Sequence, residues 1–160
     1  MSGWDWVPVS DGDDRARGIF HRHYSYRRYA DGRNPRLFVG PGEKGVLLTL
    51  NCQALFVWRK FINASGEEGV NCSVFRNEGG HGCLNSQHDH CSSNLIRRAD
   101  EYAWQRWPGQ RHYTYVNPKR ISSANPGYCF KRAGWNECGK TKGGLVVLSI
   151  AAPDPEESLS

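Results

Sequence analysis

A short stretch between residues 79 and 91 carries side chains of the kinds that bind metals. It contains three histidines and two cysteines within eleven residues, among glycines and small polar residues: His81, Cys83, His88, His90 and Cys91. Imidazole and thiolate groups suit zinc, and glycines let a loop wrap around an ion. The spacing matches no standard zinc knuckle, so a flexible loop with incidental thiols and a Cys83–Cys91 disulfide are the alternatives. If a metal binds, the thiolates favour a closed structural zinc site over a catalytic iron.

The segments on either side of this stretch predict an anion site. Residues 70–75 have the composition of a strand, and a helix is expected to open at Ser92 and Ser93, which are both good N-caps. The first N–H groups of a helix lack partners within it and point outward with the positive end of the dipole. Phosphate is the expected ligand, and an ordinary capped amphipathic helix is the alternative.

The periodicity of residues 92–107 predicts this helix. Apolar residues at i, i+4 spacing define one face, namely Leu95, Ile96, Ala99, Ala103 and Trp107. Charged residues, Asp100 among them, occupy the rest, and Pro108-Gly109 ends the helix.

Arginines are concentrated in residues 15–36. This segment contains seven arginines and a single acid, Asp31, together with two histidines and three tyrosines. The net charge is +5 and the pI is near 9.0. Cations for phosphates mixed with rings for stacking are what a nucleic-acid surface needs. A solvated basic face is the alternative.

Length and composition indicate one domain over residues 1–152, with residues 79–91 as an insertion loop. An acidic, proline-containing tail, residues 153–160, is expected to be disordered. The sequence has neither an apolar run of membrane-spanning length nor an export signal, so we expect a soluble cytoplasmic protein that binds no membrane. Three cysteines in apolar surroundings, Cys52, Cys72 and Cys129, are then expected to be reduced core thiols.

Local patterns predict the remaining elements. A strand over residues 4–9 precedes a helix from about residue 15 to residue 29. Strand material follows at 37–39, 46–50, 54–62 and 70–75, then the long helix, a strand at 113–117 and a short helix from Asn125-Pro126 to Ala133, closed by Gly134. Two strands, 137–141 and 145–150, end the domain. Short turns between strands predict a mostly antiparallel sheet in a mixed α/β fold.

This order of elements resembles the GNAT acyltransferase fold. The closest match is the segment from Asn125 to Trp135, followed by Gly139, in which an Asn opens a late helix and a Gly-aromatic pair closes it. The resemblance implies a twisted sheet of about six or seven strands flanked by helices, and acetyl-CoA or a related acyl-CoA as cofactor. The cofactor-binding residues would be Phe75, Arg76, Asn77, Ser92, Ser93, Asn125, Tyr128 and Phe130.

Two positions depart from the GNAT pattern. The usual pyrophosphate loop, Gln/Arg-x-x-Gly-x-Gly/Ala, is replaced by Arg76-Asn77-Glu78-Gly79-Gly80 and the insertion, which leaves phosphate binding to the helix N-terminus and serine hydroxyls. Phe130 occupies the position where many GNAT enzymes keep a tyrosine that reprotonates the coenzyme A thiolate. A phenylalanine cannot donate that proton.

Within the superfamily, His23-Tyr24-Ser25 in the basic N-terminal segment and the late Asn-Pro-Gly-Tyr-Cys-Phe segment are most similar to phage DNA-modification proteins of the Mom type. This resemblance implies a transferase that converts adenine in double-stranded DNA to an N6-carbamoylmethyl form and so shields phage DNA from restriction in the bacterial host. Acetyl-CoA binding and iron are associated with that family. The sequence does not predict the oligomeric state.

Modification of the adenine amine requires that the base leave the helix stack. Tyr24, Trp58, Tyr113 and Tyr115 are candidates for stacking on it, with core packing as the alternative. The candidates for contacts to DNA phosphates are Arg22, Arg27, Arg28, Arg33 and Arg59.

The attacking amine must also lose a proton. His23 has a suitable pKa without any shift. Two carboxylates, Glu78 and Asp100, are further candidates, for which pairing with Arg76 and a solvent-exposed charge are the respective alternatives. The full catalytic set is His23, Tyr24, Ser25, Glu78, Asp100 and Tyr115.

Two other functions fit the same sequence. One is an acetyl-CoA-dependent N-acetyltransferase acting on a protein or small-molecule amine, against which Phe130 and the N-terminal arginines argue. The other is a metal-stapled DNA-binding module without enzymatic activity.

Overall fold

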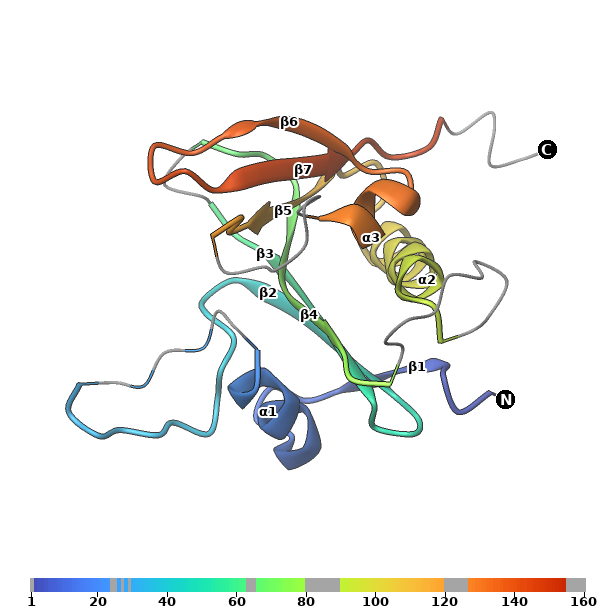
Figure 1. Cartoon of the computed structure of the whole chain (residues 1–160). Helices are drawn as coiled ribbons and strands as arrows, with labels where there is room; N and C mark the ends of the chain where they lie inside the picture. Colours follow the sequence, from blue (N-terminus) through green and yellow to red (C-terminus); the bar gives the residue numbers. More distant parts are fainter. Residues whose placement is uncertain are drawn as a thin grey trace.

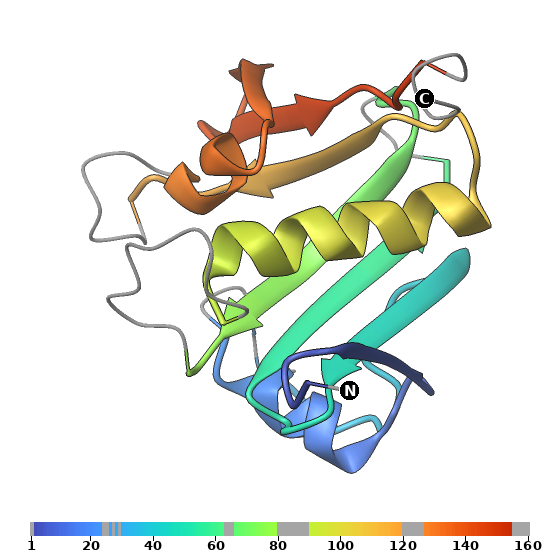
Figure 2. The same ribbon diagram turned by 90° about the vertical axis from the view of Figure 1, so that its right-hand side faces the viewer.

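A computed structural model describes residues 2–23, 26, 28, 30–62, 66–79, 90–119 and 127–154. Figures 1 and 2 show a twisted sheet with helices on both faces. The strands are β1 (Trp6–Val9), β2 (Glu43–Thr49), β3 (Ala54–Lys60), β4 (Val70–Asn77), β5 (His112–Val116), β6 (Asn136–Lys140) and β7 (Val146–Ile150). The helices are α1 (Asp14–His21), α2 (Ser92–Arg106) and α3 (Tyr128–Arg132).

The seven strands form one open sheet in the order β1-β2-β3-β4-β5-β7-β6. Every neighbouring pair is antiparallel except β4 and β5, which are parallel. The predicted mixed α/β class and mostly antiparallel sheet are confirmed.

The parallel pair is short. Val70, Asn71 and Cys72 of β4 lie opposite His112, Tyr113 and Thr114 of β5. Beyond these pairs β4 continues to Asn77 and β5 to Val116, and Figure 2 shows the two strands separating. The sheet is therefore open between the carboxyl ends of β4 and β5.

One face of the sheet is covered by α2 and α3. The predicted apolar face of α2 is confirmed, since Leu95, Ile96, Ala99, Ala103 and Trp107 are all buried. Two tryptophan indoles from the sheet tie α2 down: Trp6 donates to the carbonyl of Leu95 at 2.8 Å and Trp58 to that of Ala99 at 3.1 Å. The opposite face is covered by α1, whose Ala16 and Ile19 pack in a second cluster with side chains of β2, β3 and β4.

The first helix is shorter than predicted. It ends at His21, not near residue 29, and Arg22 is its C-cap. Aromatic contacts favour the turn, because Tyr26 packs back against Phe20 and His21 with ring centroids 5.4 and 4.5 Å away. A continued helix would carry Tyr26 away from both rings.

Two further local predictions are wrong. Residues 37–39 form no strand, because the N–H groups of Phe38 and Val39 donate to the carboxylate of Asp11 at 2.9 and 3.2 Å. Neither Ser92 nor Ser93 is the N-cap of α2; Cys91 is, without a side-chain capping bond. The Asn77 amide donates to the carbonyl of His90 and the hydroxyl of Ser92. These two contacts hold the chain so that the N-cap is Cys91, one residue before the predicted Ser92.

The start of the parallel pair generates a stability prediction. Gly69 has φ +120°, and a Cβ there would collide with the carbonyl oxygen of Arg111, which accepts from the Val70 N–H. We expect Gly69→Ala to lower the free energy of unfolding by about 2 kcal/mol or more. Gly66 also has positive φ, +79°, but nothing lies within 4 Å of the point that an added methyl group would occupy. Gly66→Ala should therefore cost only about 1 kcal/mol in urea unfolding, and equal losses in the two variants would contradict this account.

Candidate functional site

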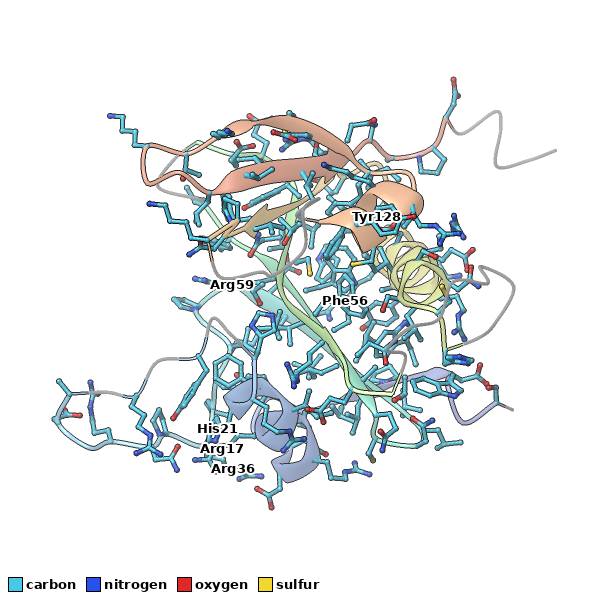
Figure 3. The ribbon with its side chains drawn as sticks, in the orientation of Figure 1. Arg17, His21, Arg36, Phe56, Arg59 and Tyr128 are labelled. Atoms are coloured by element: carbon cyan, nitrogen blue, oxygen red, sulfur yellow. The ribbon has the colours of Figure 1, made fainter. Side chains whose placement is uncertain are left out.

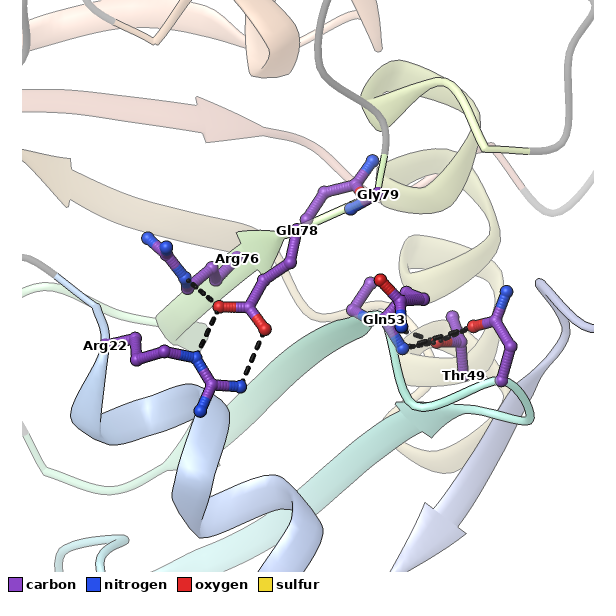
Figure 4. Close-up of polar contacts among 9 residues, drawn as sticks. Arg22, Thr49, Gln53, Arg76, Glu78 and Gly79 are labelled. Atoms are coloured by element: carbon purple, nitrogen blue, oxygen red, sulfur yellow. Dashed lines mark hydrogen bonds and ion pairs between the residues drawn. The ribbon is translucent and has the colours of Figure 1, made fainter.

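An ion-pair cluster lies at the carboxyl end of β4. Glu78 receives two hydrogen bonds of 2.7 Å from the guanidinium of Arg22 and one of 2.8 Å from that of Arg76, as Figure 4 shows. The hydrogen bonds from Arg22, which has the larger effect, and from Arg76 lower the pKa of Glu78 to about 2. Glu78 is therefore ionised at neutral pH and is a weak base. The structure therefore contains the Glu78–Arg76 pair that was the alternative to a catalytic role for Glu78. Arg22, a candidate for contacts to DNA phosphates, also pairs with Glu78.

His23 lies beside this cluster. Its imidazole is partly buried and hydrogen-bonded to the backbone of Phe75. Burial, assisted by the charge of Arg76, lowers the pKa of His23 to about 4. The prediction of an unshifted pKa is wrong, because sequence alone did not place the imidazole against a strand and an arginine. At neutral pH the ring is uncharged and a ring nitrogen can accept a proton, but the pKa of about 4 makes His23 a weaker base than an unshifted imidazole.

The N-terminus of α2 faces the same end of β4. Its first intrahelical bonds run from the N–H groups of Asn94 and Leu95 to the carbonyl of Cys91, and no acidic residue lies in the first turn. Backbone N–H groups of Ser92 and Ser93 thus fit a phosphate. The hydroxyl of Ser93 does not fit one, because it is buried 3.5 Å from the Cys91 sulfur.

The other side of the opening is formed by β5 and α3. Phe130 is buried and meets Phe75 of β4 edge to face, with ring centroids 5.9 Å apart. Tyr115 lies on β5 beyond the last pair with β4, and Tyr128 is half exposed on α3. Burial raises the pKa of the Cys129 thiol to about 11, so this neighbour is an inert thiol.

Asp100 lies elsewhere, in the core beneath α2. Its carboxylate is 2.7 Å from Nδ1 of His112 and accepts from the indole of Trp135 at 2.9 Å. The alternative to a catalytic role for Asp100, a solvent-exposed charge, is wrong, because only 2% of the residue is exposed. Burial raises the pKa of Asp100, and the hydrogen bond from His112 opposes that shift. His112 pairs with Val70 at the start of β4, so Asp100 is at the opposite end of the strand from Glu78.

Two of the candidates for stacking on a base belong to the core. Trp58 and Tyr113 have no exposed surface, so neither can receive a base, and the alternative of core packing holds for both. Arg59 stacks 3.7 Å above the Phe61 ring and donates to the carbonyl of Pro41. Arg28 and Arg33 are exposed, and Arg33 pairs with Asp31 at 2.7 Å.

Several predicted residues lie outside the described part of the chain, namely Tyr24, Ser25, Arg27, His81, Cys83, His88 and Asn125. Of the proposed metal ligands only His90 and Cys91 are described. Within the described ranges no group of three or more His, Cys, Asp or Glu residues could hold a metal ion.

Sequence reasoning missed a pocket of about 370 Å3 between α1 and residues 34–40. Its aromatic lining comes from Phe20, His21, Tyr26 and Phe38. The local signal was the basic aromatic segment, but the wall formed by Phe38 depends on Asp11, which is distant in sequence.

Comparison of the sequence with protein-family models gives no match, and comparison with curated proteins gives none either. None of the helices in the described ranges is long and apolar enough to pass through a membrane.

The buried Asp100 gives a prediction for stability. Asp100→Ala leaves His112 and the Trp135 indole without their acceptor, so we expect a loss of about 3 kcal/mol in the free energy of unfolding. Glu101→Gln on the exposed side of α2 is the control and should change stability by less than about 0.5 kcal/mol. Urea unfolding of both variants measures the difference, and a mild effect of Asp100→Ala would refute the structural role.

The depressed pKa of His23 predicts a pH dependence. Between pH 6.5 and about 4 the unfolded chain binds a proton that folded His23 does not, so stability falls as the pH decreases through this window. We expect His23→Gln to remove a fall of about 2 kcal/mol, measured by urea unfolding at a series of pH values. Glu78→Gln should retain that fall and instead remove the loss between about pH 4.5 and 2, because the pKa of Glu78 is lowered. A His23→Gln profile parallel to the wild type would contradict the assignment.

Proposed function

We propose that this chain is a GNAT-like transferase of the Mom type that acts on DNA. It would transfer an acyl-derived, carbamoylmethyl-like group to the N6 amine of adenine in double-stranded DNA and so protect the DNA from restriction. The observation that carries the proposal is the opening between β4 and β5, which lies beside the N-terminus of α2 and the ion-pair cluster at the end of α1.

The sheet supports the GNAT part of the proposal. A single parallel pair in an otherwise antiparallel sheet separates after three residue pairs, which is where the GNAT resemblance expects the carrier to bind. The GNAT resemblance requires an opening of this kind. Phe75 and Phe130 supply an apolar contact at its base.

The residues around the opening fit the phosphates of an acyl-CoA. The Ser92 and Ser93 N–H groups are in the first turn of α2, where the positive end of the dipole favours an anion and no acid competes. Asn77 holds this turn against the end of β4. When bound, the acyl-CoA would supply the group that is transferred.

His23 is the proton acceptor in this proposal. In the transfer, the new bond from the adenine nitrogen to the carbon would replace the carbon–sulfur bond of the acyl-CoA. Coenzyme A would leave as the thiolate, and the proton lost by the amine would pass to uncharged His23. Glu78 is not needed as a base; ionised and paired with Arg22 and Arg76, it positions the end of α1 against β4. His23, two residues after His21, is thereby held at the opening.

The basic segment supports DNA as the substrate. Arg28, Arg33 and Arg36 are exposed, so they are accessible to phosphates. An N-acetyltransferase with a simple amine substrate would have no use for this segment. Phe130, which is buried and has no hydroxyl, offers no proton to a thiolate.

Mass spectrometry of nucleosides from DNA of cells expressing the protein tests the proposal. We expect a modified deoxyadenosine with the wild-type chain and at least tenfold less with His23→Gln, since general-base catalysis contributes about 100-fold or more. Ile62→Ala, at a 99% exposed position outside the site, is the control and should leave the yield unchanged.

Thermal melts would establish that His23→Gln is folded. Four unmodified nucleosides only, with folded wild-type protein and acyl-CoA present, would refute the proposal. Release of free thiol with simple amines and no DNA would point to the N-acetyltransferase instead.

A further inference from the structure

The pocket beside α1 shares the end of that helix with the carboxyl end of β4, because Phe20 and His21 line the pocket and Arg22 pairs with Glu78 after β4. It is bounded by the end of α1 and by residues 34–40, and its volume of about 370 Å3 falls within the range of small-molecule sites. Figure 3 places Arg17, His21 and Arg36 together on this side of the molecule, away from Tyr128 on α3.

The walls of the pocket are flat rings. Phe20 and Phe38 are stacked with centroids 4.9 Å apart and planes inclined by 21°. His21 and Tyr26 are stacked at 4.5 Å and 28°. In each pair one side of a ring is covered by the other ring, so a planar guest would stack on the outer side of a pair, as any nucleobase can irrespective of its identity.

The pocket is built by contacts remote in sequence. Asp11 accepts from the N–H groups of Phe38 and Val39 and pairs with Lys44 at 2.9 Å, which fixes one wall. Arg17 on α1 donates to the carbonyl of Asn34 at 3.1 Å and ties the same segment to the helix. A pocket held in this way needs little reorganisation to bind a guest.

Polar groups at the pocket suit a nucleotide. Arg28 lines it and is exposed, and Asn34 lies at its edge. An asparagine amide matches the donor and acceptor on the edge of adenine, and exposed arginines match the flanking phosphates. Burial and the charges of Arg17 and Arg28 lower the pKa of His21, so its ring is uncharged at neutral pH.

We propose that this pocket receives a nucleobase extruded from double-stranded DNA, with Phe20, Tyr26 and Phe38 as the stacking surface. The inference rests on the proposed function, which requires an extruded base but does not locate it. Trp58 and Tyr113 are excluded by their burial, whereas the pocket is open and His21 is two residues from His23. Arg28 binds the DNA backbone at the pocket rim.

The test measures binding without any acyl donor. Fluorescence anisotropy compares a duplex bearing one adenine opposite an abasic position, which leaves the stack readily, with the fully paired duplex of the same sequence. We expect the wild-type chain to bind the first duplex about tenfold more tightly. Tyr26→Leu and Phe38→Leu should each remove most of that preference while leaving affinity for the paired duplex unchanged.

Charge is tested by a separate pair of variants. Arg28→Gln should weaken binding to both duplexes and reduce the salt dependence, because one phosphate contact is lost. Lys142→Gln, an exposed cation in the turn between β6 and β7 at the other edge of the sheet, is the control and should change neither.

Equal wild-type affinity for the two duplexes, or an undiminished preference in folded Tyr26→Leu and Phe38→Leu, would overturn the proposal. Binding of adenosine monophosphate that depends on Tyr26, with no preference between the duplexes, would overturn DNA as the source of the base.

The outcome is separable from that of the nucleoside analysis. If Tyr26→Leu forms the modified nucleoside as well as the wild type does, the base-binding role of the pocket is refuted and the transferase proposal stands. If the preference for the duplex with the unpaired adenine depends on Tyr26 but no modified nucleoside forms, the base-binding role of the pocket stands and the transferase proposal is refuted.

Discussion

The carboxylate of Asp100 connects three parts of the chain in the core. It belongs to α2, and its two oxygens contact His112 of β5 and Trp135 just before β6. His112 is stacked on Trp104 with ring centroids 4.5 Å apart and is fully buried. Burial of a carboxylate is costly unless its oxygens are satisfied, so this arrangement tolerates few alternative placements of α2. At the other end of β4, the Asn77 amide holds the N-terminus of α2 in place.

The arginines of the N-terminal segment divide into two kinds. Arg22 and Arg17 are used by the fold, the first in the pair with Glu78 and the second as a donor to Asn34. Arg15 and Arg33 are likewise paired, with Asp13 and Asp31, whereas Arg28 and Arg36 are exposed. The count of seven arginines in the sequence thus overstates the charge available to a partner, and the exposed ones lie on the side of the sheet covered by α1. Clustering of cations on one side favours a polyanion more than the net charge does.

Local pattern predicted most of the sheet and the buried face of α2, because alternation and i, i+4 spacing report directly which side of an element is buried. It failed where a distant residue decides. Asp11 takes the N–H groups of Phe38 and Val39 away from a strand, and Asn77 sets where α2 begins. Asp100 lies among charged neighbours in sequence, and its contacts with His112 and Trp135, 12 and 35 residues away, explain its burial. The lowered pKa of His23 likewise depends on β4, which follows about 50 residues later.

The three residue pairs between β4 and β5 also have a consequence for synthesis of the chain. β2, β3 and β4 form an antiparallel meander from contacts close in sequence, so they can associate while the later residues are still in the ribosome. Until α2 and β5 emerge, β4 is an edge strand with apolar residues such as Val70, Cys72 and Phe75 uncovered. The partly synthesised sheet can therefore pair with strands of other chains. This exposure ends when α2 packs on the sheet, where the indoles of Trp6 and Trp58 donate hydrogen bonds to it.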